Sequence, residues 1–146
     1  MPGTPAAPTV VRMTVRPVAG YDGDALRAYL AQHRAVLDAG DLEGISDRFD
    51  LPALLVEQDR TTLLESPEQV RELDHGRPAA TDARDAVAAV PEVVSLEEVG
   101  WALLWVDVRW SYVDELAAEL TSERCRYLLR RGRDTFEICA LVPLPR

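Results

Sequence analysis

The first half of the chain carries apolar residues at helical spacing, separated by short polar turns. Residues 21–40 predict a long helix that ends at Gly40, because glycine accepts the left-handed conformation common just after a helix. A second, short helix is expected over 42–49, and Pro52 is expected to stop it. Ser66, Pro67 and Glu68 are typical of the start of a third helix. The buried stripe of the long helix consists of Leu26, Leu30, His33 and Leu37.

The second half is dominated by β-branched and aromatic residues and predicts strands. We expect a first hairpin within 53–66, long strands within 91–113, and a last hairpin within 122–142. Residues 114–121 join the last two of these regions as a helix or a loop, and 75–90 form a loop with a partial helix. Helices followed by long antiparallel strands indicate an α+β domain.

In the last hairpin, the pattern favours a register with Leu129 opposite Phe136, because a slip by one residue would bury Glu137. This register places Cys125 and Cys139 on opposite faces, so they cannot form a disulfide with each other. The inner face then holds Cys125, Tyr127, Leu129, Phe136, Ile138 and Ala140. The outer face holds Arg124, Arg126, Arg130, Glu137 and Cys139.

Residues 101–112 alternate between an apolar face and a mixed face. The apolar face is the natural inner wall of the domain and consists of Ala102, Leu104, Val106, Val108, Trp110 and Tyr112. The outer face carries Trp101, Leu103 and Trp105, followed by Asp107, Arg109 and Ser111. Burying one such tryptophan or leucine is worth about 2–3 kcal/mol, so we expect a homodimer through Trp101, Leu103 and Trp105.

Two alternatives to this dimer remain open. Residues 77–90 or the N-terminal arm would cover the apolar patch, or the inside and outside labels would be exchanged. In the second case Asp107 and Arg109 would enter the cavity instead of forming a pair at the rim of the dimer.

Composition and charge narrow the function classes. The chain has 146 residues, 47% of them hydrophobic, which fits one domain over 21–146 preceded by a flexible arm, 1–20, with one possible edge strand. The net charge of −9 argues against nucleic acid. All 16 basic residues are arginine, typical of a GC-rich bacterial genome, so lysine Schiff-base chemistry is excluded. We expect no membrane span, no secretory signal and a cytoplasmic protein. The two cysteines and two histidines lack the spacing of a metal site.

The segment "AGDLEGI" (39–45), followed by Phe49, Pro52 and an apolar strand, resembles the nuclear transport factor 2-like superfamily, which includes ketosteroid isomerases and SnoaL-type polyketide cyclases. The resemblance implies a cone-shaped, curved antiparallel sheet wrapped around the long N-terminal helix, a cystatin-like α+β barrel. In that fold a pocket opens at the wide end of the cone.

The resemblance also places site residues by position. The isomerases' general base corresponds to Glu57, their helix-borne oxyanion donor to His33, and their second donor to Cys125. Burial of Glu57 in an apolar cone would raise its pKa and suit it to proton transfer. The alternatives are an exposed glutamate beside a turn and a core histidine satisfied by the backbone. Further candidates for binding the substrate are Tyr29, Tyr112, Tyr127, Cys125 and Trp110.

These observations predict a small enzyme that acts by acid/base chemistry on an apolar carbonyl compound, as an isomerase, cyclase or dehydratase. Such a site needs no cofactor, because a dry pocket and placed polar groups supply the catalysis. The alternative is a non-catalytic dimeric module of the same fold that binds a ligand or assists another protein.

Overall fold

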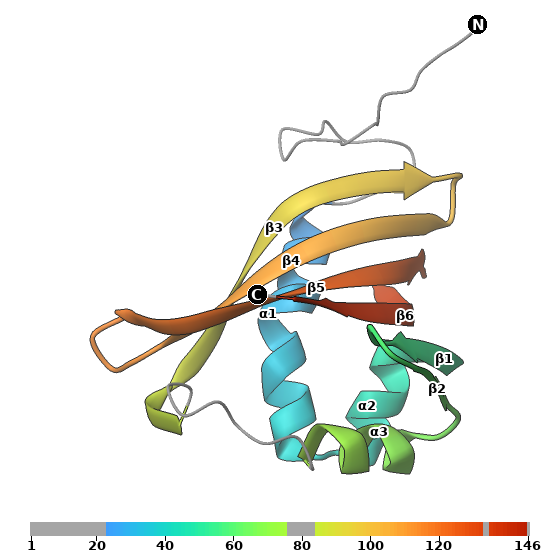
Figure 1. The fold of residues 1–146 in the computed structure, drawn as a ribbon. Coiled ribbons are helices and arrows are strands. Elements are labelled where there is room, and N and C mark those ends of the chain that lie inside the picture. Colours follow the sequence, from blue (N-terminus) through green and yellow to red (C-terminus); the bar gives the residue numbers. More distant parts are fainter. Residues whose placement is uncertain (1–22, 76–83, 133–134, 146) are drawn as a thin grey trace, which may run out of the picture.

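A computed structural model describes residues 23–75, 84–132 and 135–145, which form three helices and six strands (Figure 1). The predicted arm 1–20 lies outside the described residues, as do residues 76–83 of the open segment 75–90; the end of that segment, from Ala88, belongs to a strand. The helices are α1 (Gly23–Ala39), α2 (Leu42–Arg48) and α3 (Pro67–His75). The strands are β1 (Phe49–Val56), β2 (Thr61–Leu64), β3 (Ala88–Val99), β4 (Leu103–Val113), β5 (Glu119–Arg131) and β6 (Phe136–Leu144).

The strands form one curved, unclosed sheet in the order β2-β1-β6-β5-β4-β3. Neighbouring strands are antiparallel except β1 and β6, which pair in parallel. Helix α1 lies against the sheet, and α2 and α3 stand beside the β1–β2 hairpin (Figure 1). This arrangement confirms the predicted α+β class with a curved sheet around a long helix. No helix among the described residues is long and apolar enough to cross a membrane.

The long helix forms as its apolar spacing predicts. Its buried residues are Leu26, Tyr29, Leu30, His33 and Leu37. The helix ends before Gly40, whose φ of +66° is the left-handed conformation that glycine adopts without strain. The ring of His75 packs against this turn, and its Nε2 lies 3.1 Å from the carbonyl oxygen of Leu37. The close packing leaves no room for a side chain at Gly40.

The junction between α2 and β1 differs from the prediction. The helix ends at Arg48, and Phe49 already begins the strand, so Pro52 lies inside β1 and does not stop a helix. Pairing with β2 begins at Ala53, and pairing with β6 is interrupted between Phe49 and Leu54. Pro52 therefore occupies a break in the ladder, where its missing N–H costs no hydrogen bond.

Strands β5 and β6 form the predicted hairpin with a shifted register. Arg131, and not Leu129, lies opposite Phe136; a shift by two residues keeps each side chain on its expected face. A bulge between Leu128 and Leu129 then changes the parity of β6. Beyond it, Ala140 pairs with the outward-facing Leu128, so its predicted place on the inner face is wrong.

The connecting segments are simpler than the sequence suggested. Residues 114–118 form a turn in which the Asp114 carboxylate accepts the N–H groups of Leu116 and Ala118 at 2.9 and 3.0 Å. Strand β5 follows at Glu119, so the helical alternative for 114–121 is wrong. Helix α3 begins as predicted, with the Ser66 hydroxyl accepting the N–H of its first turn.

Substituting Gly40 with alanine tests the packing at the end of α1. A Cβ at Gly40 would lie 2.9 Å from His75 Cε1 and would also have to adopt a positive φ. Gly100 is a matched control, because its φ is +73° and nothing lies within 4 Å of an added Cβ. Urea unfolding should show a loss of about 1 kcal/mol for Gly100→Ala from the backbone alone. Gly40→Ala should lose clearly more; equal losses would contradict close packing against His75.

Candidate functional site

A cavity of about 570 Å³ lies between α1, α3, the β1–β2 hairpin and the inner faces of β4, β5 and β6. Its size is typical of pockets that hold a small molecule. The wall is largely apolar and includes Leu37, Phe49, Leu64, Val70 and Leu141. Leu141 reaches this wall because the bulge in β6 places it opposite Tyr127 on the inner face. Charged residues, including Glu57, Arg60 and Asp74, lie among the lining residues as well.

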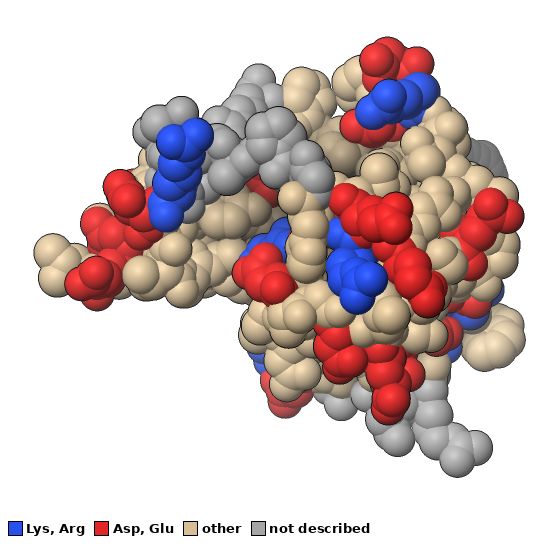
Figure 2. All heavy atoms as spheres, turned by 90° about the horizontal axis from the view of Figure 1, so that it is seen from below, with Lys and Arg blue, Asp and Glu red and all other residues tan. Residues whose placement is uncertain are grey.

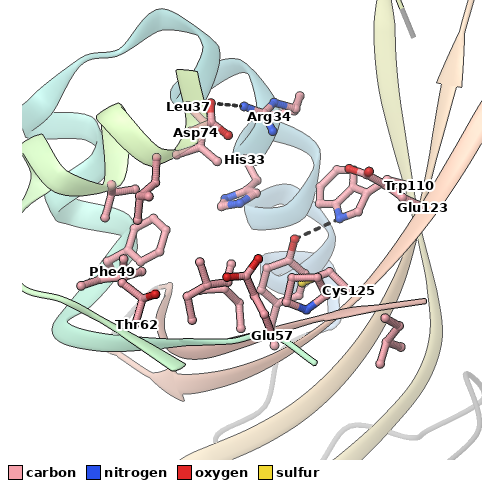
Figure 3. A pocket seen from close by; sticks show the side chains of 18 of the residues that line it. His33, Arg34, Leu37, Phe49, Glu57, Thr62, Asp74, Trp110, Glu123 and Cys125 are labelled. Carbon is pink, nitrogen blue, oxygen red and sulfur yellow. Dashed lines mark hydrogen bonds and ion pairs between the residues drawn. The ribbon is translucent and has the colours of Figure 1, made fainter. Parts of the chain in front are cut away.

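His33 projects from α1 into an aromatic part of this wall (Figure 3). Its side chain is buried, with 5% of the residue exposed. The centre of its ring lies 5.8 Å from that of Tyr127, 5.9 Å from that of Trp110 and 6.3 Å from that of Phe49. An imidazole in such surroundings is separated from bulk water.

Burial, reinforced by the neighbouring Arg48, sets the protonation state of this imidazole. The Nε–H of Arg48 donates to Nδ1 of His33 across 3.3 Å. Burial and the positive charge of Arg48 together lower the pKa of His33 to about 3. The ring is therefore neutral, and because Nδ1 accepts a hydrogen bond, its hydrogen lies on Nε2. Among the described residues no group accepts from Nε2, which leaves this hydrogen for a ligand.

Arg48 is itself buried, with 8% of the residue exposed. Its guanidinium lies 3.9 Å from the ring centre of Tyr29 and donates to the Tyr29 carbonyl. The Tyr29 hydroxyl in turn donates to the Arg48 carbonyl at 2.8 Å. Within the described part of the chain, no carboxylate pairs with Arg48. Its charge is stabilised by an aromatic face and by neutral acceptors.

Tyr127 and Trp110 add a second polar point to the inner wall. The indole N–H of Trp110 donates to the Tyr127 hydroxyl oxygen at 3.0 Å. Burial raises the pKa of Tyr127 well above its usual value, so the phenol stays neutral. Tyr112 also lines the cavity, and its hydroxyl donates to the carboxylate of Glu123.

Glu57 stands at the end of β1 and points toward the cavity that His33 also faces (Figure 3). Its side chain is 33% exposed, and its carboxylate accepts from Arg60 Nε at 2.9 Å. The apolar enclosure expected around Glu57 is therefore absent. The two candidate catalytic groups share one cavity, with His33 in its dry part and Glu57 in contact with solvent.

Every predicted site residue except Tyr29 lines the cavity. Tyr29 is absent from the cavity wall, and its hydroxyl is engaged by Arg48. The sequence analysis did not single out Arg48. The available signal was its spacing: Ile45 and Arg48 are three residues apart, so they share the buried face of α2.

The alternative that placed Asp107 and Arg109 in the cavity is wrong, because neither residue lines it. The predicted pair between these two residues does not form either. Asp107 is 3% exposed and pairs with Arg124 and Arg126 of β5, while Arg109 pairs with Glu119 at 2.8 Å.

The face of the molecule that carries α3 is mostly acidic (Figure 2). In Figure 2, which views the molecule from the end that carries α3, acidic side chains surround a smaller number of arginines. Within the described ranges, no group of three or more His, Cys, Asp and Glu could hold a metal ion. Cys125 is buried in the cavity wall, and Cys139 on β6 is partly buried.

The lowered pKa of His33 predicts a pH dependence of stability. In the unfolded chain His33 has an ordinary pKa of 6.5, whereas in the folded protein it binds a proton only near pH 3. The free energy of unfolding should therefore fall as pH falls between these values, by about 2 kcal/mol from roughly pH 6 to pH 4. His33→Phe should lose this contribution in urea titrations, while the control His75→Gln should keep it. An unchanged slope in His33→Phe would contradict a buried neutral imidazole.

Solved structures share this architecture at low sequence identity. A cystatin-like domain of unknown function from Nostoc punctiforme aligns with a TM-score of 0.57 and 18% identity over 86% of this chain and 77% of its own. An NTF-2 like protein of unknown function from Silicibacter pomeroyi aligns with a TM-score of 0.57 and 13% identity, over 84% and 94%. An NTF2-like protein from Cytophaga hutchinsonii aligns with a TM-score of 0.56 and 12% identity, over 82% and 93%. These likenesses show the fold alone.

The family comparison covers the whole described domain. A search of curated proteins gave no match. Residues 23–146 match the family described as NTF2-like protein (DUF6841). The expected resemblance to the nuclear transport factor 2-like superfamily is thereby confirmed, and this chain belongs to that NTF2-like family.

Proposed function

We propose that this protein is a cytoplasmic, cofactor-independent enzyme that binds a small, largely apolar carbonyl compound and moves a proton on it. His33 donates its Nε2 hydrogen to the carbonyl oxygen, and Glu57 carries the proton. Tyr127, Trp110, Tyr112 and Cys125 shape the wall around the substrate.

The observation that carries this proposal is the neutral imidazole donor in an apolar cavity. A neutral donor with no protein acceptor suits a ligand oxygen. In a site that excludes water, a hydrogen bond of this kind stabilises developing negative charge more strongly than it would in water.

The proton step balances without any further reactant. A carboxylate oxygen of Glu57 takes a proton from the carbon beside the carbonyl, and the electron pair of the broken C–H bond forms the enolate. The enolate oxygen accepts the hydrogen bond from His33. The protonated Glu57 then returns a proton to the same carbon or to another carbon of the conjugated system.

The ion pair between Glu57 and Arg60 favours a second candidate function. Glu57 pairs with Arg60 at the solvent-exposed edge of the cavity. It could therefore serve as part of a charged rim around a bound ligand as well as a general base. In that case the protein is a dimeric binding or accessory module, and His33 orients the ligand without any proton transfer.

Two matched probes distinguish the carbonyl from its apolar frame. The ketone 2-acetonaphthone and the hydrocarbon 2-ethylnaphthalene differ chiefly in the carbonyl oxygen. In fluorescence titrations the ketone should bind about tenfold more tightly, because one hydrogen bond is worth about 1 kcal/mol or more. His33→Phe should remove this preference. If neither compound binds, or if both bind equally well, the proposed ligand class is wrong.

Deuterium exchange tests the proton step on the same ketone. In D2O, the wild-type protein should speed incorporation of deuterium into the acetyl methyl group, followed by proton NMR. Glu57→Gln should slow it at least about 100-fold, the usual contribution of a general base. Asp59→Asn is the matched control, because Asp59 lies in the same turn without lining the cavity. Carbonyl-dependent binding without exchange would leave the binding module as the function.

We also propose that the protein is a homodimer through the outer sheet face. Trp101 is 81% exposed in the turn before β4, and Leu103 and Trp105 are partly exposed on the outer face of that strand. Trp105 pairs with Leu128 across β4 and β5, which extends the apolar surface. Such a surface gains from burial against a second copy.

Sedimentation equilibrium tests the dimer. Trp105→Glu should yield monomers, because burying an unpaired carboxylate in the interface costs several kcal/mol. Leu116→Glu is the control, since Leu116 is 88% exposed in the turn before β5. A wild-type protein that sediments as a monomer would rule out the interface.

A further inference from the structure

Arg48 contacts Nδ1 of His33, the ring nitrogen that accepts a hydrogen bond. We propose that Arg48 is a positioning residue, whose guanidinium holds His33 in the Nε2–H form so that the imidazole always offers a hydrogen to the cavity. The inference rests on the proposed function for its consequence, although the state of the ring is measurable without any ligand.

The geometry fixes both ends of this contact. One nitrogen of Arg48 donates to Nδ1 of His33 at 3.3 Å, and another donates to the carbonyl of Tyr29. The Tyr29 ring covers the guanidinium at 3.9 Å, and its hydroxyl bonds back to the Arg48 carbonyl. An arginine held at several points cannot turn away from His33. A guanidinium has hydrogen-bond donors and no acceptor. Arg48 can therefore only donate to Nδ1, and Nδ1 must carry no hydrogen.

Among the described residues, those in ring contact or hydrogen-bond contact with His33 include no carboxylate. The residues against His33 are Tyr29 from α1, Arg48 from α2, Phe49 from β1, Trp110 from β4 and Tyr127 from β5. The other charge that acts on it is the cation of Arg34 in its own helix. None of these groups is a carboxylate that could accept from Nδ1–H or stabilise an imidazolium. The surroundings thus favour a neutral ring with one defined tautomer.

The consequence is a defined ligand preference. The position beside Nε2 takes a hydrogen-bond acceptor, such as a ketone, an enone or an enolate oxygen. It disfavours an ammonium ion or any other group that can only donate. The uncompensated charge of Arg48 behind the ring further favours an oxygen that gains negative charge during the reaction.

Nitrogen NMR on protein labelled with ¹⁵N-histidine tests the proposal directly. The chain has two histidines, so a His75→Gln variant assigns the His33 signals. Wild-type protein without ligand should show a pyrrole-type signal for Nε2 and a pyridine-type signal for Nδ1. These signals should persist down to the acidic limit of folding.

Three variants separate the hydrogen bond from charge alone. Arg48→Met should lose the single tautomer and give a mixture, with the His33 titration moving to higher pH. Arg48→Lys, which keeps a donor and the charge, should restore the wild-type signals. Arg34→Met removes the other cation that acts on His33 but leaves the Nδ1 contact, so it should keep the single tautomer. If Arg48→Met does not fold, Arg48→Ala, which leaves space for water beside Nδ1, is read in the same way.

Two results would overturn the proposal: a hydrogen on Nδ1 in the wild-type protein, or an unchanged tautomer in the folded Arg48→Met or Arg48→Ala variant. Failure of the proposed function looks different. In that case the wild-type tautomer is as stated, yet 2-acetonaphthone binds no better than 2-ethylnaphthalene. If both inferences hold, Arg48→Met should reduce the ketone's advantage about twofold, because only the Nε2–H part of the tautomer mixture donates to the ketone, and Arg48→Lys should restore it.

Discussion

The burial of a polar pair, His33 and Arg48, between the long helix and the sheet is the constraint around which this domain is arranged. A histidine in the middle of an apolar stripe must find a partner once the helix packs. Arg48 supplies it, but a buried cation without a carboxylate is costly in turn. Tyr29 stabilises this cation, because its ring stacks on the guanidinium and its carbonyl accepts a hydrogen bond from it. The two residues thus tie α1 to α2 and fix where the first strand begins.

Irregularities in the sheet complete the cavity. The break in the pairing of β1 accommodates Pro52, and the bulge between β5 and β6 turns Leu141 toward the inner wall. Without the bulge, strict alternation would continue Ala140 on that wall and point Leu141 outward. A single extra residue therefore changes which side chain of β6 reaches the cavity wall.

Much of the fold could be predicted from local pattern, because helical spacing and strand parity depend on residues close in sequence. The stripe on α1 and the inner face of β4, including Trp110, were available in this way. The bulge and the tautomer of His33 were not, because both depend on pairing between distant segments. Arg48 illustrates the limit: its partners lie 15 and 19 residues away, and a local pattern predicts the turn between them but not which side chains then meet.

The cavity places the two candidate groups, His33 and Glu57, in different environments. Burial lowers the pKa of His33, so its imidazole stays neutral. It therefore cannot carry a proton between substrate and solvent near neutral pH. Glu57 is partly exposed to solvent, pairs with Arg60 and lacks an apolar enclosure. A reaction that needs one fixed hydrogen-bond donor and one mobile proton matches this division. A reaction that needs two proton carriers would require a second titratable group in the dry part, and there Tyr127 is held neutral by burial.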